Sequence, residues 1–265
     1  MPREVRGWLL SVYADQVEGA VLWLLAEDGK RHRLTQPFQT TFYISGDDGR
    51  LKSIQADLKK FYPRPKTAFL TRRDLYSGML PVLAIQVDNP VAQQRLFYRM
   101  KRSYKWIRYF DAKIPFPIRY GVSKKVFPMA KCKVQVDDQD QILEIEALDS
   151  PWDMAFDLPP LRILAIEPDV DPHHATPASL TTQYEDVQHT LSLSDEPRLL
   201  KQFQSILDEY DPDVIFARWG DGWLFPFLIA SAKRYGIDFN PSRDEGQKYH
   251  SIQENTFESY GSIYF

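Results

Sequence analysis

Residues 211–236 read DPDVIFARWGDGWLFPFLIASAKRYG, and this stretch decides the fold of the second half of the chain. It opens with an Asp-Pro pair that breaks helices, continues with a short apolar run typical of a buried strand, and then carries an apolar segment of helical length. Gly236 follows that segment, at the position where a left-handed helix cap is favoured. A buried strand followed by a helix predicts an α/β domain here.

The sequence on either side supplies further elements of the same domain. Residues 161–168, LRILAIEP, predict the buried first strand of a sheet, and residues 188–194, QHTLSLS, predict another strand. Ser194 is expected to cap a helix over 195–210, where apolar residues recur at steps of three and four. Two last strands are expected within 251–265.

The first half of the chain alternates strands and helices. Its first 45 residues predict a meander of antiparallel strands, with turns at Asp28-Gly29 and at 47–49. The sequence next predicts a helix at 53–62, strands at 66–76 and 82–89, and a helix that begins near Pro90. An irregular stretch at 115–128 and a hairpin at 131–149 follow. This order is typical of a compact α+β domain. The proline-bounded segment 150–160 predicts a connector, which places the two domains at 1–155 and 156–265.

Bulk composition excludes several classes of protein. The chain has 265 residues, a formal net charge of −3 and 43% hydrophobic residues, which suits a globular protein with a sizeable core. Cys132 is the single cysteine of the sequence, so no disulfide forms within the chain and a reducing compartment is expected. The first ten residues lack a secretory pattern, and the longest apolar runs are too short to span a bilayer. We therefore expect a soluble intracellular protein without a membrane partner.

The charge is distributed unevenly. Between residues 95 and 133 a single acidic residue, Asp111, stands among many basic ones. The basic residues are Arg95, Arg99, Lys101, Arg102, Lys105, Arg108, Lys113, Arg119, Lys124, Lys125, Lys131 and Lys133. Aromatic residues, Trp106 among them, are interleaved with these cations, a pattern that suits a surface that follows phosphates and stacks bases. The alternative is a helix with a solvated basic face and a buried aromatic stripe.

Several ordered segments resemble the family B DNA polymerases. Residues 208–237 are similar to the second exonuclease region of that family, in which a helix, DPDVI, an Asn-containing turn, Phe-Asp and a proline follow one another. Residues 159–168, PPLRILAIEP, resemble the first exonuclease motif, which ends in Asp-Ile-Glu. Residues 109–128 resemble the segment that joins the N-terminal domain to the nuclease, and SRDEGQ (242–247) and GSIYF (261–265) also fall in family order. The resemblance implies a mixed α+β N-terminal domain followed by an incomplete, ribonuclease H-like α/β domain of the 3′→5′ exonuclease type.

The resemblance also implies that the nuclease is inactive. The family cleaves phosphodiesters with two divalent metals held by carboxylates, and alternate positions on a strand put two carboxylates on one face. The family's Asp and Glu of the first motif fall on Ala165 and Glu167, its Asn on Trp219, and its metal-binding Asp on Leu224. A methyl or isobutyl group cannot bind a metal. We therefore expect no catalytic residue here, and only Glu167 and Asp221 remain as candidate metal ligands.

Other uses of the acidic residues stay open. A divergent nuclease would use Glu167, Asp169 and Asp221, whereas the simpler interpretation makes Asp169, Asp171, His173 and His174 solvated loop residues. The family's third nuclease motif is absent from this sequence.

Two sets of residues are candidates for contact with DNA. The candidate DNA-binding residues are Lys101, Arg102, Lys105, Arg108 and Arg119. In archaeal relatives a stretch similar to KIPFPIRY lines a pocket that captures uracil in the template. Pro115, Phe116 and Pro117, with Tyr120 nearby, are thus candidates for a template-base pocket. The alternative is that these residues pack a hinge between the domains.

The resemblance implies the N-terminal portion of a DNA polymerase without the palm motifs that polymerisation needs. We expect no cofactor in this chain, with Mg²⁺ or Mn²⁺ serving the parent polymerase. The expected partners are DNA, as a single strand or primer-template, and the remaining polymerase domains. The expected location is the cytoplasm, on the nucleoid of a prokaryote. The alternative from another class is a stand-alone DNA-binding or assembly module.

Overall fold

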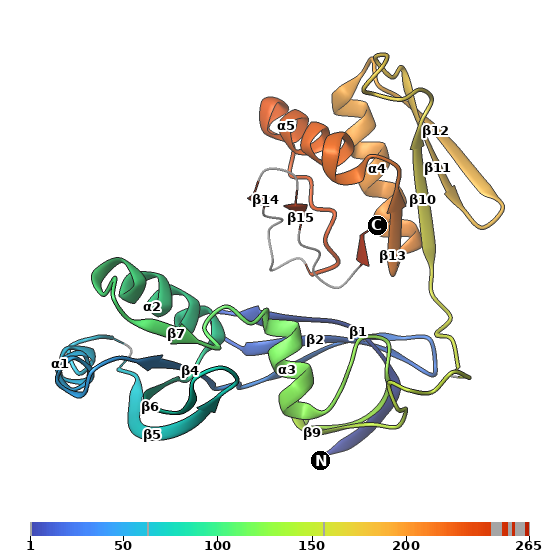
Figure 1. Cartoon of the computed structure of the whole chain (residues 1–265). Coiled ribbons are helices and arrows are strands. Elements are labelled where there is room, and N and C mark those ends of the chain that lie inside the picture. The colour runs from blue at the N-terminus through green and yellow to red at the C-terminus, as the bar shows by residue number, and fades with distance from the viewer. Residues whose placement is uncertain are drawn as a thin grey trace. The chain divides into compact units, whose positions relative to one another are not determined.

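The computed structural model of the chain describes residues 2–62, 64–155, 157–244, 251–253, 256–257 and 263–264 (Figure 1). The chain divides into two compact units, Met1–Met154 and Ala155–Phe265. The assignment of these units to a polymerase N-terminal domain and an exonuclease-type domain stays a prediction. Among the described residues, no helix combines the length and the apolar character needed to cross a membrane.

A five-stranded antiparallel sheet forms one half of the first unit, in the order β3-β2-β1-β8-β9. Its strands are β1 (Arg3–Asp15), β2 (Gly19–Ala26), β3 (Arg31–Gln36), β8 (Lys131–Val136) and β9 (Ile142–Ala147). All eight residues of β2 are buried, which explains the unbroken apolar run in its sequence. The meander β1-β2-β3 and the hairpin β8-β9 confirm the predicted pairing of these segments.

The fourth predicted strand of the meander belongs to a different sheet. Strand β4 (Thr40–Ser45) does not pair with β3 but with β6 and β7, in a four-stranded sheet of order β5-β6-β4-β7. The prediction was wrong because Pro37 interrupts the chain after β3 and lets it leave the first sheet. Asp47, predicted in a turn, instead accepts the backbone N–H of Arg50 and caps a helix.

The four-stranded sheet carries both of its helices on one face. Its other members are β5 (Lys66–Asp74), β6 (Gly78–Val87), β7 (Arg108–Phe110), α1 (Asp48–Leu58) and α2 (Pro90–Ser103). Apolar residues of the two helices, such as Ile54 and Met100, form one buried cluster with Phe42, Ile44 and Leu83 of the strands. The predicted helix near Pro90 is confirmed, and the Asn89 side chain caps it.

The stretch 115–128 contains a helix, α3 (Phe116–Lys124), where the sequence predicted irregular structure. The three prolines of this stretch suggested a break, but Pro117 lies in the first helical turn, where a missing N–H costs no hydrogen bond. Phe116 and Tyr120 of α3 pack against Phe38, and this contact holds the helix on the first sheet.

The second unit contains a mixed sheet of order β12-β11-β10-β13-β16. Its described elements are β10 (Ile163–Pro168), β11 (Ser179–Tyr184), β12 (Val187–Ser192), α4 (Glu196–Tyr210), β13 (Val214–Ala217), η1 (Gly220–Leu224), α5 (Phe225–Tyr235) and β16 (Ile263–Tyr264). Strands β10 and β13 run parallel, and Gly236 has the predicted left-handed conformation, with a φ of 62°.

Some local predictions for the second unit were wrong. Strand β11 was not predicted, because its polar sequence SLTTQY lacks an apolar face. Asp195 caps α4 in place of Ser194, and its side chain accepts the backbone N–H of Arg198. Two short strands, β14 (Ser251–Gln253) and β15 (Thr256–Phe257), pair near the end of the chain, while much of SRDEGQ and GSIYF lies outside the described residues. The mixed α+β class is confirmed for the whole chain.

Candidate nuclease-like site and nucleic-acid interface

Strand β10 places Ala165 and Glu167 on the same face of its sheet. Leu164 and Ile166 point to the other face, where they are buried against α4 and α5. The shared orientation of Ala165 and Glu167 is the one that a pair of metal ligands would need, but Ala165 supplies a methyl group. Its partner across the sheet, Phe216 of β13, is 55% exposed. This face of the sheet therefore carries a methyl group, between Phe216 and Gln183 of β11, where the family pattern places a carboxylate.

Leu224 is part of the hydrophobic core. It closes the π-helical turn η1 and is fully buried within the cluster that α4, α5 and the sheet form. Trp219 precedes this turn with a φ of 55°, and the guanidinium of Arg218 lies 4.6 Å from its ring centroid. A core side chain thus occupies the position that the resemblance gives to a metal-binding Asp.

Asp169 and Asp171, the two carboxylates that follow Glu167, accept hydrogen bonds from nearby backbone N–H groups. Asp169 accepts the backbone N–H of Ala178 at 3.0 Å, which fixes the connection into β11. Asp171 accepts the backbone N–H of His173 and contacts the ring of His174 at 2.9 Å. These hydrogen bonds, those to backbone first, lower the pKa of Asp171. Both side chains serve turns, as solvated loop residues commonly do.

The described carboxylates of this region do not form a cluster that fits two divalent metals. Glu167 and Asp221 are exposed, but Asp221 lies at the start of η1 and Glu167 lies on β10. Within the described part of the chain, no group of three or more His, Cys, Asp or Glu side chains is arranged to hold a metal ion. The role of Glu167 and Asp221 as ligands stays a prediction.

The predicted DNA-binding cations cluster around the end of α2. Lys101 and Arg102 lie in its last turn, where positive charge is favourable to the helix dipole, and Lys105 follows in an exposed loop. Trp106 beside them is 87% exposed, an unusual state for a large aromatic side chain. Exposed cations beside an exposed ring are what a single nucleic-acid strand would contact.

Arg108 and Arg119 have different surroundings. Arg108 on β7 is exposed and lies 3.4 Å from the hydroxyl of Ser77. Arg119 is half-buried and donates to the carbonyl oxygens of Thr41 and Asp111, and this burial lowers its pKa. Arg119 thus links α3 to the second sheet through these hydrogen bonds. Its contact with DNA stays a prediction.

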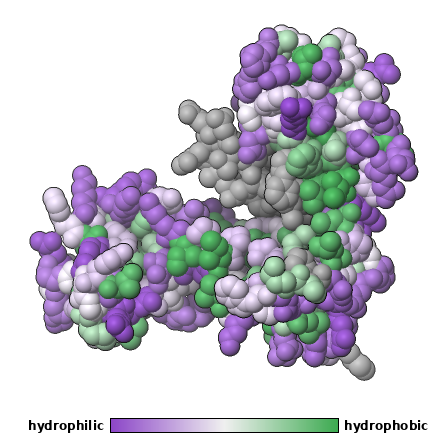
Figure 2. All heavy atoms as spheres, turned by 45° about the vertical axis from the view of Figure 1, so that its right-hand side comes forward, coloured by the Kyte–Doolittle hydropathy of each residue, from purple (hydrophilic) through white to green (hydrophobic). Residues whose placement is uncertain are grey.

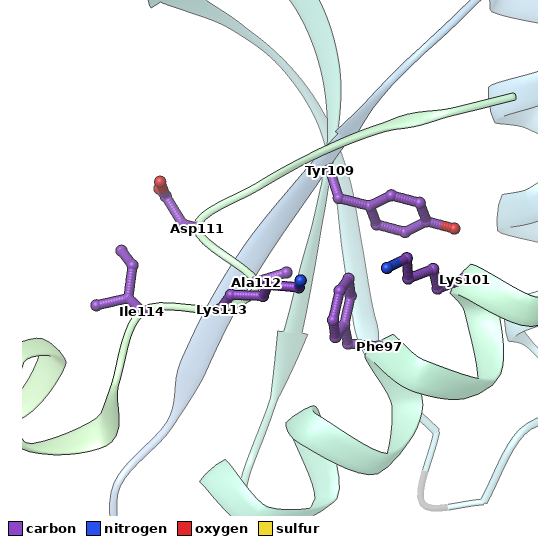
Figure 3. Close-up of a pocket in the computed structure, with 7 residues that line it drawn as sticks. All are labelled: Phe97, Lys101, Tyr109, Asp111, Ala112, Lys113 and Ile114. Carbon is purple, nitrogen blue, oxygen red and sulfur yellow. The ribbon is translucent and has the colours of Figure 1, made fainter. Parts of the chain in front are cut away.

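A pocket of about 480 Å³ lies between α2 and the loop that follows β7 (Figure 3). Lys101 from α2 and Lys113 from the loop both reach into it, with the rings of Phe97 and Tyr109 as its apolar wall. Burial raises the pKa of Tyr109 to about 12, so its hydroxyl stays neutral and donates to the carbonyl of Tyr104. Lys113 and Tyr109 belong to the basic and aromatic run of the sequence, but only the fold brings them to one pocket.

The candidate template-base residues pack against the core of the first unit. Phe116 lies 5.4 Å from Phe38 between ring centroids, and Tyr120 is fully buried and donates to Gln36 at 2.9 Å. Pro115 and Pro117 are exposed. The cavity that borders Pro117 and Tyr120 measures about 40 Å³, far below the volume of ordinary ligand sites. A base-binding role for these residues stays a prediction.

The chain is similar in sequence and in structure to known DNA polymerases. The DNA polymerase of Archaeoglobus fulgidus is 22% identical over 261 residues, which cover 91% of this chain and 32% of that protein. The DNA polymerase of Thermococcus litoralis is 27% identical over 205 residues, 77% of this chain and 11% of its own length. The solved structure of the family B DNA polymerase from Pyrobaculum calidifontis matches with a TM-score of 0.74 and 20% identity, over 98% of this chain and 36% of that one. The chain is homologous to archaeal DNA polymerases.

The fold is that of a family B DNA polymerase fragment, as the resemblance implied. This chain spans about a third of the Archaeoglobus polymerase and a smaller share of the Thermococcus polymerase. No protein-family model matches it. The homology to DNA polymerases therefore rests on whole-chain similarity, and the function of each site rests on the side chains described above.

Proposed function

We propose that this chain forms the N-terminal portion of a family B DNA polymerase, where it binds DNA and supports the catalytic domains, and that its 3′→5′ exonuclease site does not cleave. The observation that carries the second part is the pair of apolar side chains, Ala165 on β10 and buried Leu224, at positions that the family motifs give to metal-binding aspartates. Two-metal hydrolysis needs several oxygen ligands around each ion. Without those ligands the site would hold neither ion in the position that hydrolysis needs.

The topology of the second unit supports the ribonuclease H-like assignment. Three antiparallel strands, β10, β11 and β12, precede a helix and then β13, which runs parallel to β10. The proposed site would lie on β10, at the centre of this sheet. A domain of this type can persist without catalysis because its core still supports its neighbours.

The end of α2 supports the proposed DNA contact. Lys101, Arg102 and Lys105 are exposed beside Trp106, and Lys101 also lines the pocket with Lys113. Cations of this kind neutralise phosphates, and aromatic rings stack on bases. The proposed partners are thus DNA, as a single strand or primer-template, and the other domains of the polymerase. The proposed metal of the parent enzyme is Mg²⁺ or Mn²⁺, and the proposed location is the cytoplasm.

Nuclease activity is tested with single-stranded DNA labelled at its 5′ end, incubated with high concentrations of the chain and either Mg²⁺ or Mn²⁺. We expect no shortening from the 3′ end. Glu167→Gln tests the divergent alternative, and Glu144→Gln, which alters another exposed carboxylate on a strand, is the matched control. Metal-dependent shortening that Glu167→Gln abolishes and Glu144→Gln preserves would overturn the proposal.

DNA binding is tested by replacing Lys101, Arg102 and Lys105 together by alanine. We expect affinity for DNA to fall, and the slope of log affinity against log salt concentration to decrease by up to about 2. The matched control replaces three exposed cations elsewhere in the first unit, Lys59, Lys60 and Arg64, by alanine. Equal losses in both variants would mean that net charge, and no specific surface, accounts for binding.

The parent reading frame distinguishes the polymerase from a stand-alone module. Palm motifs with metal-binding Asp residues downstream of residue 265 would support the polymerase proposal. A stop codon at that point would favour the stand-alone module instead.

A further inference from the structure

The second sheet of the first unit has a βαββαβ order. The elements β4, α1, β5, β6, α2 and β7 follow one another, and the strands lie in the order β5-β6-β4-β7 with every neighbouring pair antiparallel. This arrangement puts both helices on one face of the sheet. The buried cluster confirms it, because Ile54 of α1 and Met100 of α2 pack with alternate strand residues such as Phe42 and Ile44. The residues between those strand positions point to the opposite face.

That opposite face carries aromatic rings on two neighbouring strands. Tyr43 of β4 pairs with Phe110 of β7 on one side and with Ala84 of β6 on the other. Ala84 in turn pairs with Ala68 of β5. Tyr43 and Phe110 are half-buried. Ala84 and Ala68 are too small to cover these rings, and the side chain that lies over Tyr43 is Arg72.

Two arginines accompany these rings. The guanidinium carbon of Arg72 on β5 lies 4.0 Å from the ring centroid of Tyr43, and that of Arg108 on β7 lies 5.8 Å from Phe110. Asp111 accepts from Arg72 at 2.7 Å and holds the guanidinium over the ring. The Arg72 side chain is still 44% exposed. A guanidinium plane stacked on an aromatic ring is itself a surface on which a base can stack.

The rim of the face adds apolar contact area. Figure 2 shows one side of the molecule, on which hydrophobic residues gather in small patches among hydrophilic ones. At the rim of this sheet face the exposed apolar side chains include Leu70 and Tyr76. Leu70, which shares this face of β5 with Arg72, is 48% exposed. At the turn between β5 and β6, Tyr76 is 92% exposed, and Asp74 shapes the turn by accepting the backbone N–H of Ser77.

We propose that this face of the sheet, defined by Tyr43, Arg72, Arg108 and Phe110, binds single-stranded DNA by base stacking. Phe110 and the outer plane of the Arg72 guanidinium, which covers Tyr43, receive unstacked bases, while Arg108 contacts the phosphate between them. Paired bases in a duplex are stacked on each other and offer no free faces, so the surface selects single strands. The proposal rests on the proposed DNA-binding role and assigns it a second surface, separate from the cations at the end of α2.

The test uses the full chain and a fluorescein-labelled strand of twenty deoxythymidines, with binding followed by fluorescence anisotropy. The variant Tyr43→Leu with Phe110→Leu removes both rings and keeps their apolar volume. We expect it to weaken single-strand binding about tenfold and to leave duplex binding unchanged. The matched control, Tyr43→Phe with Phe110→Tyr, keeps two rings and is expected to bind as the natural chain does.

A second measurement does not depend on the fold of a variant. Strands that contain 5-bromodeoxyuridine are cross-linked by light to the unaltered chain, and the cross-linked peptides are mapped. We expect cross-links within 40–45 and 108–110. Cross-links confined to 101–106, together with full affinity of the Tyr43→Leu, Phe110→Leu variant and reduced affinity of the Lys101, Arg102, Lys105 variant, would overturn this inference and leave the proposed function standing. No binding of any DNA by the natural chain would overturn both.

Discussion

Two sheets of this chain differ in the face that their helices leave uncovered. In the β5-β6-β4-β7 sheet, the face away from α1 and α2 carries arginines and aromatic rings. In the β10 sheet, the face away from α4 and α5 carries Ile163, Ala165 and Phe216. Both sheets bury one face under helices. The first face offers planes and positive charge, which suit a nucleic-acid strand. On the second face, Ala165 stands where the family pattern places a carboxylate, and Glu167 lies two residues further along the same strand.

Sheet architecture therefore does not by itself reveal whether the face away from the helices carries a functional site. Helical packing constrains alternate residues of each strand, such as Ile44 and Ile166, because their burial stabilises the fold. The residues between them are free to change without loss of the core. A nuclease can therefore lose its chemistry while its fold stays intact.

The largest effect is expected from restoring an acidic residue at position 224. Leu224→Asp buries a carboxylate in a site without polar partners, and we expect the free energy of unfolding to fall by about 4 kcal/mol or more. Urea unfolding followed by circular dichroism measures it. Leu224→Ala, which leaves only a cavity, is the control and should cost about 2–5 kcal/mol. If the Asp variant were as stable as the natural chain, position 224 would have access to solvent and a carboxylate there could reach a metal ion.

A smaller loss is expected from removing the link between α3 and the second sheet. Arg119→Ala leaves the carbonyls of Thr41 and Asp111 without their donor, and we expect a destabilisation of about 1–3 kcal/mol. DNA affinity should change less than in the Lys101, Arg102, Lys105 variant. Unchanged stability with a large loss of DNA affinity would instead assign Arg119 to the DNA-binding surface.

Tyr109, which packs under α1 and α2 in the first unit, is expected to make the fold less stable at alkaline pH. Burial raises the pKa of Tyr109 to about 12, whereas the unfolded side chain ionises near 10. The folded state thus keeps its proton longer, so the stabilisation is complete below pH 10 and is lost as the pH rises from about 10 to 12. A difference of two pKa units corresponds to about 2.7 kcal/mol. Tyr109 is only half-buried and solvent screens its charge, so we expect Tyr109→Phe to reduce this part of the pH dependence by about 1 kcal/mol. Tyr62→Phe, at a 98% exposed position, should leave the profile unchanged.

The smallest effect is expected on the open face of the β10 sheet. Ala165→Asp restores the carboxylate that the family pattern places beside Glu167, on a face that helices do not cover. We expect a change in the free energy of unfolding below about 1 kcal/mol and no nuclease activity, because Leu224 still supplies no ligand. Unfolding curves and the labelled-strand assay measure the two quantities. Activity in this single variant would show that two carboxylates suffice.

Local sequence patterns predicted most elements of this chain. Alternation and apolar runs located β1, β2, β6 and β10, and Asn89 with Pro90 located the start of α2, because these signals act within a few residues. They failed where long-range contacts decide. Strand β4 left the predicted meander to join a second sheet, and α3 formed in a proline-rich stretch because Phe116 and Tyr120 found a core to pack against.

For the sites, the sequence by itself determined only which side-chain types are present. Ala165 and Leu224 cannot bind a metal in any fold, and the basic run from 95 to 133 is present whatever its shape. Only the tertiary structure decided which residues meet. It buried Leu224, directed Arg119 to backbone carbonyls, and placed Arg72 over Tyr43, 29 positions away in the sequence, because strand pairing joins residues that no local pattern connects.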